Sequence, residues 1–190
     1  MSSAEDRLDP EQRRVLLDLG LRSIEHGLDH GHPIPLDASR YDPALQSPRA
    51  TFVTLHREGA LRGCVGTLEV RRPLVKDVVE SAFKAAFRDP RFAPLGRPEF
   101  EGLELHISVL SPLEPLPVAS EEELLAKLRP GIDGLLIREG GRDGTFLPSV
   151  WDSLPDASEF VRSLKEKAGL PRDYWSDRIE TQRYTVESIP

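Results

Sequence analysis

Apolar residues recur every three to four positions in two long stretches of the chain, which is the spacing of one helix face. The first stretch covers about residues 10–26, and Asp9 followed by Pro10 is a typical helix start. The second covers residues 74–87 and ends before the pair Asp89-Pro90. Because an apolar helix face must be buried, we expect the second helix to cover a sheet.

Two shorter helices are predicted in the second half of the chain. Ser120 and Glu123 have the spacing of a capping box and precede a leucine-rich turn. Asp156 or Ser158 can cap a second short helix, which runs to Lys167 and is followed by a glycine and a proline.

Strand patterns lie between these helices. Residues 51–57 are rich in β-formers, Glu58-Gly59 supplies a turn, and residues 60–70 can return as the partner strand of a hairpin. Residues 103–109 alternate between apolar and polar side chains, as a strand with one buried face does.

A second hairpin is predicted further along the chain. Residues 134–138 and 145–150 flank a glycine-rich turn at 140–144, and residues 178–189 read as one final strand. Hairpins outnumber the crossover helices that a parallel sheet needs. The predicted class is therefore α+β, with mainly antiparallel sheets covered by helices.

Two stretches are expected to lack regular structure. Residues 28–50 contain four prolines and read as an extended connection. Residues 1–8 are polar and read as a flexible N-terminal tail ahead of one domain that fills the rest of the 190 residues.

Composition narrows the class of protein. With 38% hydrophobic and 30% charged residues the chain is typical of globular proteins, and it has no apolar run of membrane-spanning length. The acidic N-terminus does not resemble a secretory signal, and the single cysteine, Cys64, rules out an internal disulfide. We therefore expect a cytoplasmic protein. A net charge of −7 argues against a nucleic-acid partner.

The segment from Leu61 to Thr67 is the strongest chemical candidate. It places two glycines inside a strand pattern, with the only thiol between them. Arg62 lies two positions from Cys64 and is expected on the same strand face, where a guanidinium favours the reactive thiolate form. The alternative is that Cys64 is a small buried residue and that the glycines only let a helix pack closely.

Two further groups of residues could carry chemistry. Glu104, His106 and Ser108 are expected on one strand face, which is either a proton-transfer row or the solvated side of a sheet.

His26, His30 and His32 lie near the end of the first helix and could hold a metal together with Asp29. His26 and His30 would be neighbours only if the helix continued past Gly27. The alternative is a solvated helix end, and on the sequence alone we assign no metal ligands and no cofactor.

Several segments together resemble the AMMECR1 domain family, the A protein of the AmmeMemoRadiSam system. The run from Leu61 to Thr67, LRGCVGT, is similar to the most specific signature of that family. The other matching segments are residues 85–92, 104–111, 144–151 and 167–170, with Trp175. The similarity covers about residues 9–189.

The resemblance implies a two-lobed fold with a cleft near Arg62 and Cys64. It implies a binding or accessory component that acts with Memo-like and radical-SAM partners. The alternative is an enzyme in which Cys64 is the nucleophile, Arg62 binds an anionic group, and Glu104 or His106 moves protons. The candidate substrate-binding residues are Arg62, Gly63, Gly66 and Arg91.

Overall fold

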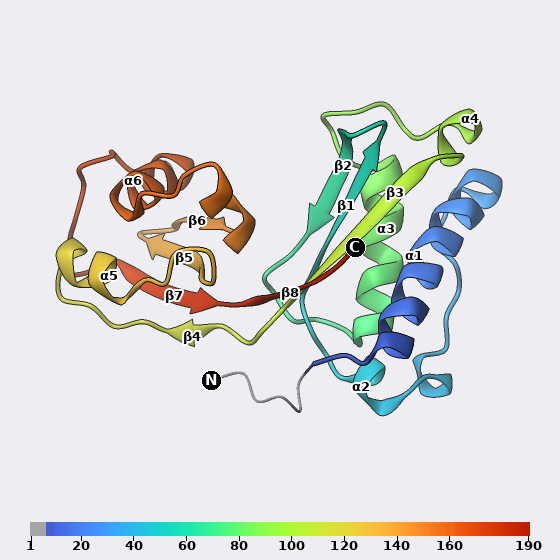
Figure 1. Cartoon of the computed structure of the whole chain (residues 1–190), viewed down its shortest axis with the longest axis horizontal. Helices are drawn as coiled ribbons and strands as arrows, with labels where there is room; N and C mark the ends of the chain where they lie inside the picture. The colour runs from blue at the N-terminus through green and yellow to red at the C-terminus, as the bar shows by residue number, and fades with distance from the viewer. Residues whose placement is uncertain (1–6) are drawn as a thin grey trace. The chain divides into compact units, whose positions relative to one another are not determined.

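The chain divides into two units, each with its own sheet and its own helices. A computed structural model describes residues 7–190, shown in Figure 1. The first unit comprises Met1–Leu110 and Glu187–Pro190, and the second comprises Ser111–Val186. The second unit is thus inserted into the chain of the first. Both units combine helices with antiparallel strand pairs, which confirms the predicted α+β class.

The sheet of the first unit has the strand order β2-β1-β3-β8. These strands are β1 (Thr51–Arg57), β2 (Ala60–Gly66), β3 (Leu103–Leu110) and β8 (Val186–Ile189). β1 pairs antiparallel with both β2 and β3, so the first predicted hairpin is confirmed.

Two helices, α1 (Pro10–His30) and α3 (Leu74–Phe87), cover one face of this sheet. Val53 and Leu55 of β1 point to this face and are fully buried. Because the alternate positions Thr54 and His56 remain half-buried, the opposite face carries the polar side chains of the sheet.

α1 is four residues longer at its end than the sequence predicts. Gly27 lies inside the helix and does not end it. A Cβ there would lie 2.5 Å from Phe87 and 2.8 Å from Phe83, so the glycine is needed for close packing on α3. The helix ends at Gly31, whose φ of 74° is left-handed.

The connection from α1 to β1 is more regular than expected. It contains the 3₁₀ turn η2 (Ala38–Arg40) and the short helix α2 (Pro43–Gln46), each capped by an aspartate side chain. A further short helix, α4 (Arg97–Phe100), precedes β3.

The sheet of the second unit has the order β4-β7-β5-β6. Its elements are β4 (Glu114–Pro115), α5 (Glu121–Lys127), β5 (Gly134–Glu139), β6 (Arg142–Phe146), η3 (Pro148–Asp152), α6 (Ala157–Lys167) and β7 (Glu180–Tyr184). Ser120 and Asp156 cap α5 and α6 as predicted. The rings of Trp151 and Phe160 stack with centroids 3.8 Å apart in this core.

Two sequence predictions in this region are wrong in detail. The turn of the second hairpin is Gly140-Gly141, both with positive φ, so residues 142–144 belong to β6 and residues 148–152 form η3. The predicted final strand is two strands in different sheets, β7 and β8, with Thr185 between them.

Residues 1–6 of the expected N-terminal tail lie outside the described residues, whereas Leu8 is held in place. Leu8 is 4% exposed, and its backbone N–H donates to the carboxylate of Glu187, which also pairs with Arg13 at 2.7 Å. Among the helices of residues 7–190, none is long and apolar enough to cross a membrane.

Candidate functional site

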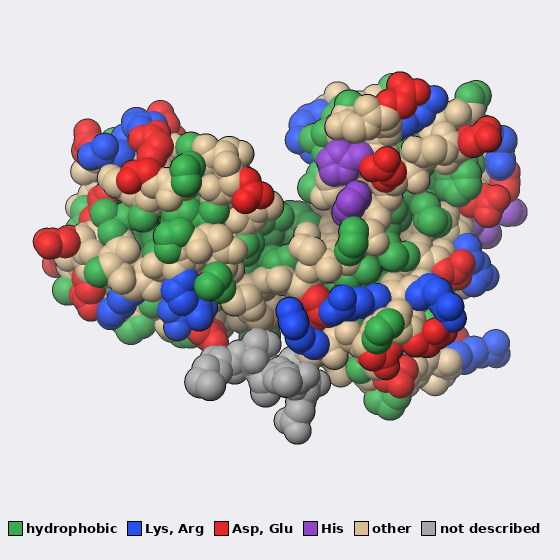
Figure 2. All heavy atoms as spheres, in the orientation of Figure 1, with side chains coloured by type: hydrophobic (Ala, Val, Ile, Leu, Met, Phe, Trp, Pro, Cys, Tyr) green, Lys and Arg blue, Asp and Glu red, His purple; other side chains and the backbone are tan. Residues whose placement is uncertain are grey.

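The polar face of the first sheet brings the sequence candidates together. We call it the Cys64 face and define it by the side chains that the strand register places opposite the helices. These residues are Phe52, Thr54 and His56 of β1, Leu61, Cys64 and Gly66 of β2, and Glu104, His106 and Ser108 of β3. Figure 2 shows histidine side chains at two separate places on the surface of the first unit.

Cys64 lies in this face between a hydroxyl and a carboxylate. Its Sγ is 3.3 Å from Thr54 Oγ1, and its backbone N–H donates to Asp89 Oδ2 at 2.9 Å. The carboxylate of Asp89 also accepts hydrogen bonds from Arg91 Nε at 3.0 Å and Nη2 at 2.7 Å. These bonds from Arg91 hold the pKa of Asp89 well below its usual range, although burial opposes them.

Arg62 does not share the face of Cys64, which corrects the sequence prediction. The register shifts between Leu55, opposite Gly63, and His56, opposite Leu61, so Arg62 is an extra residue in a bulge. The prediction assumed that side chains of β2 alternate between the two faces at every residue, and the bulge interrupts this alternation.

The side chain of Arg62 is bound within the protein. Nε lies 2.8 Å from Glu99 Oε1, and Nη2 bonds Glu99 Oε2 at 3.1 Å and the Ala93 carbonyl at 3.0 Å. Only 13% of the side chain is exposed. Its hydrogen bonds lower the pKa of Glu99 to about 2. The cation linked to Cys64 is Arg91, through the Asp89 carboxylate that binds both the Cys64 backbone and the Arg91 side chain.

Gly63 and Gly66 both have a packing reason to be glycine. A Cβ on Gly63 would lie 2.1 Å from the carbonyl oxygen of Ala85 in α3. A Cβ on Gly66 would lie 2.3 Å from the carbonyl of Thr51 and 2.4 Å from the ring of Phe52. The close approach of a helix, which the sequence offered as the alternative, accounts for Gly63.

The row on β3 does face the thiol side of the sheet. His106 stands opposite Thr54, which in turn stands opposite Cys64, so a thiol, a hydroxyl and an imidazole follow one another across three strands. Cys64 and His106 are two strand spacings apart, about 9–10 Å between backbones. Glu104 is exposed and lies opposite His56, whose ring centroid is 5.3 Å from that of His106.

Sequence reasoning missed Thr54, His56 and Asp89. Thr54 and His56 could have been found, because they occupy the polar positions of the alternating pattern in β1. The sequence around Asp89 indicates only a helix end, and nothing in the local sequence links this residue to the backbone of Cys64.

Two grooves are each lined by one unit alone. One of about 350 Å³ runs along α1 beside Tyr41, and one of about 410 Å³ lies along β4 and β7. Neither is lined by Arg62 or Cys64, so neither is the cleft that the sequence resemblance implied.

One known protein family matches most of this chain. The model of the AMMECR1 family matches residues 17–189, which include most of the first unit, the whole second unit and the Cys64 face. The chain belongs to the AMMECR1 family.

Relatives of this AMMECR1-family chain span it almost completely. A protein of Methanothermobacter thermautotrophicus is 36% identical over 186 residues, covering 95% of this chain and 94% of its own. A protein of Thermotoga maritima is 36% identical over 169 residues, covering 88% and 92%. The crystal structure of an uncharacterized protein from Pyrococcus horikoshii superposes with a TM-score of 0.87 at 33% identity, covering 95% and 92%. Membership in the AMMECR1 family thus establishes the fold and leaves the activity to be argued from the site.

Proposed function

We propose that this protein is a cytoplasmic binding or accessory component that docks a partner through its Cys64 face, the partners being a Memo-like and a radical-SAM protein. The observation that carries the proposal is the arrangement of this face. It offers half-buried polar groups on three adjacent strands, while the helices bury the other side of the sheet. A row of hydrogen-bonding groups can form hydrogen bonds with the surface of another protein.

The state of Arg62 favours this function over catalysis. An enzyme that used Arg62 to bind an anionic group would need its guanidinium free, but Glu99 and the Ala93 carbonyl hold Nε and Nη2, and Nη1, which has no hydrogen-bond partner, is buried. The nearest imidazole in register, His106, is separated from Cys64 by Thr54. A nucleophile and its base normally lie within about 2.6–3.2 Å of one another.

Binding to purified partners tests the proposal. We expect a complex of roughly micromolar affinity with the Memo-like protein, the radical-SAM protein or both. His106→Glu should weaken it at least tenfold, since it adds a charge to the centre of the docking face. Glu25→Lys, on the exposed side of α1, is the matched control and should leave the affinity unchanged. Absence of a complex at micromolar concentrations, with no effect on either partner's activity, would refute the proposal.

A second candidate function, thiol chemistry at Cys64, is favoured by one observation. The thiol contacts the Thr54 hydroxyl at 3.3 Å, and the backbone of Cys64 shares the Asp89 carboxylate with Arg91. In this case Thr54 would connect Cys64 with His106 across the sheet. Cys64→Ser that abolishes the activity of the reconstituted system while partner affinity is kept would select this function over docking alone.

A further inference from the structure

We propose that His26, His30 and His32 form a binding site for one divalent transition-metal ion of the Zn²⁺ class. This site lies at the end of α1 and is independent of the Cys64 face. The chain has five histidines, and these three are the ones that the proposed function does not use.

The end of α1 brings the three imidazoles together. The helix continues through Gly27 to His30, so His26 and His30 lie one turn apart on the same side. Gly31, in the left-handed conformation, then turns the chain so that His32 returns to the pair. The ring centroids are 4.1 Å apart for His26 and His30, 4.8 Å for His26 and His32, and 6.0 Å for His30 and His32.

The three rings lie close together, but the His26–His30 and His26–His32 distances are shorter than a shared ion requires. Two imidazoles that bind one Zn²⁺ through Zn–N bonds of about 2.0–2.1 Å have ring centres roughly 5–6 Å apart. Within residues 7–190 no group of three or more His, Cys, Asp or Glu side chains stands in ligating geometry. Ion binding therefore requires the rings to turn about their side-chain bonds, which is open to His30 and His32 because both are exposed.

The hydrogen bonds leave the ligating nitrogens available. Nδ1 of His30 lies 3.2 Å from the carbonyl oxygen of His26, and Nδ1 of His32 lies 3.0 Å from that of Pro33. Because a carbonyl only accepts, Nδ1 is the donor in both bonds, and in a neutral ring of this tautomer Nε2 has the lone pair. In metal-bound histidines a backbone carbonyl typically holds the other ring nitrogen, so these bonds have to be kept or re-formed when the rings turn toward an ion.

His26 contributes a nitrogen that the protein does not satisfy. Its Nε2 is buried and has no hydrogen-bond partner, a state that costs free energy unless something binds there.

The surroundings favour a cation. The carbonyl end of a helix carries partial negative charge, and the carboxylate of Asp29, which is paired with Arg97, lies near it. Three imidazoles suit Zn²⁺, Cu²⁺ or Ni²⁺ rather than Mg²⁺ or Ca²⁺, which prefer oxygen ligands. Water, or Asp29 after release from Arg97, can occupy the fourth position.

Calorimetric titration of the untagged, chelator-treated full chain with ZnCl₂ tests the site. We expect one ion per chain, with binding that weakens as the pH is lowered from about 7.5 to about 5.5, since the ligands become protonated. His30→Ala and His32→Ala should each weaken binding by about 10–100-fold or more. Both residues are exposed, so these variants should fold, which circular dichroism checks.

The other two histidines supply the matched control. His56 and His106 also lie close together, so the double variant His56→Ala/His106→Ala removes an imidazole pair while leaving the α1 cluster intact. Its Zn²⁺ affinity should equal that of the unaltered chain. Loss of binding in this double variant, retention of full affinity in His30→Ala, or binding of several ions per chain without saturation would each overturn the proposal.

Discussion

The two glycines that flank Cys64 leave no room for a side chain, and at Gly63 the obstacle is backbone. The Cβ of an alanine would lie 2.1 Å from the carbonyl oxygen of Ala85, far inside van der Waals contact. Neither β2 nor α3 can relieve this overlap by rotating a side chain, so the strand and the helix must separate.

Gly63→Ala should therefore lower the free energy of unfolding by about 1–3 kcal/mol or more, measured by urea denaturation. Gly96→Ala is the control, because its Cβ would have no neighbour nearer than 3.6 Å and its φ is −94°. That change should cost less than about 1 kcal/mol. Equal losses in the two variants would contradict a packing role for Gly63.

The reactivity of Cys64 should depend on Arg91 rather than on Arg62. Arg91 binds Asp89, whose carboxylate accepts the backbone N–H of Cys64, whereas Arg62 leaves the strand face at a bulge and pairs with Glu99. A cation next to a thiol favours the thiolate, the form that alkylating reagents attack. Arg91→Ala should therefore slow alkylation of Cys64 by iodoacetamide at neutral pH.

Arg62→Ala should change the alkylation rate less than Arg91→Ala does, provided that the variant is folded, and Cys64→Ser serves as the blank. A larger effect of Arg62→Ala would show that Arg62, rather than Arg91, influences the reactivity of Cys64. Identical rates in all folded variants would mean that neither cation influences Cys64.

At the scale of elements, one ion pair and one backbone hydrogen bond attach the segment between α3 and β3 to the edge strand β2. Asp89 binds the backbone of Cys64 and the side chain of Arg91, and Glu99 binds Arg62. The carboxylates at both ends of this segment have lowered pKa values, that of Glu99 to about 2 from 4.5.

These shifts predict how stability responds to acid. A carboxylate whose pKa is lower in the folded state stabilises the fold above its unfolded pKa, and this contribution is lost as the pH falls through the folded value. For Glu99 the window runs from 4.5 down to about 2. The stability difference between the unaltered chain and Glu99→Gln should therefore be present at neutral pH and shrink across that window.

Urea unfolding at several pH values measures this difference, and Glu104→Gln is the control because Glu104 is exposed. A gap between the unaltered chain and Glu99→Gln that stays constant down to about pH 2 would show that the Arg62 pair does not lower the pKa of Glu99.

The elements with a clear period could be predicted from the sequence, and the choices that depend on distant partners could not. The helix over residues 74–87 and the strand pair around Glu58-Gly59 agree with the structure because each has a local signal. The single final strand was wrong, because residues 180–184 pair with β5 while 186–189 belong to the other sheet. No local pattern distinguishes those partners.

The candidate site shows the same limit. Alternation correctly placed His106 on one face of its strand, and the register then brought it into line with Cys64. The bulge at Arg62 could not be predicted, because it depends on which residues of β1 and β2 pair.

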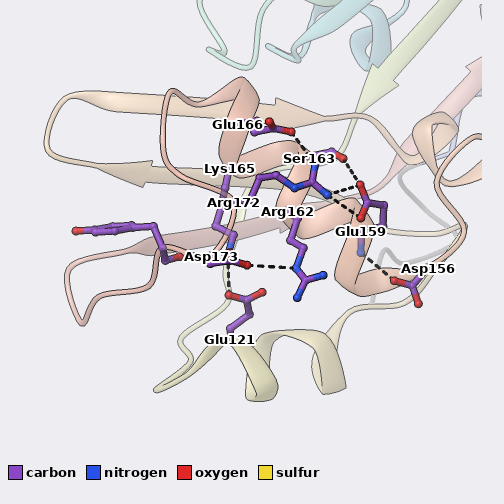
Figure 3. A network of polar contacts seen from close by, with 10 residues as sticks. Glu121, Asp156, Glu159, Arg162, Ser163, Lys165, Glu166, Arg172 and Asp173 are labelled. Carbon is purple, nitrogen blue, oxygen red and sulfur yellow. Dashed lines mark hydrogen bonds and ion pairs between the residues drawn. The ribbon is translucent and has the colours of Figure 1, made fainter.

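In the second unit, a fully buried lysine joins α5 to α6. Lys165 Nζ lies 2.7 Å from Glu121 Oε2 and 3.2 Å from the carbonyl oxygen of Tyr174, and its side chain is 0% exposed. Figure 3 shows this pair beside a second group, in which Arg172 binds Glu159 and Glu166 near the surface. Of these two groups, only the Lys165–Glu121 pair contains a fully buried charged side chain.

Removing the partner of a buried charge is more costly than removing the charge itself. Glu121→Ala should lower the free energy of unfolding by about 2 kcal/mol or more, because it leaves the ammonium of Lys165 unpaired. Lys165→Met, which keeps the apolar stem, should cost less than Glu121→Ala. Arg172→Ala is the control from the exposed group and should cost about 1 kcal/mol or less. The reverse order for Glu121→Ala and Lys165→Met would show that the lysine does not need its anion.

At the scale of the whole molecule, the second unit is an insertion between β3 and β8 of the first. The chain leaves the first unit after Leu110 and returns at Glu187. The two connecting segments are adjacent, since Ser111 N–H donates to the Thr185 carbonyl at 2.9 Å and Thr185 N–H donates to Ser111 Oγ at 2.9 Å. The first unit also has its own core, formed by α1, α3 and its sheet.

A chain in which residues 112–184 are replaced by a short glycine linker should therefore fold. The linker has only to span adjacent segments, so the entropy of closing this loop is small. The shortened chain keeps β8 and its Glu187, which holds Leu8 and Arg13. We expect one cooperative urea transition and Cys64 alkylation at the rate of the full chain. A linker chain with Glu187→Ala should be less stable by about 1 kcal/mol or more, because the backbone of Leu8 loses its acceptor. If the linker chain is unfolded, the first unit needs the second for its stability. If it folds and still binds the partners of the full chain, the docking surface lies within the first unit, as the Cys64 face requires.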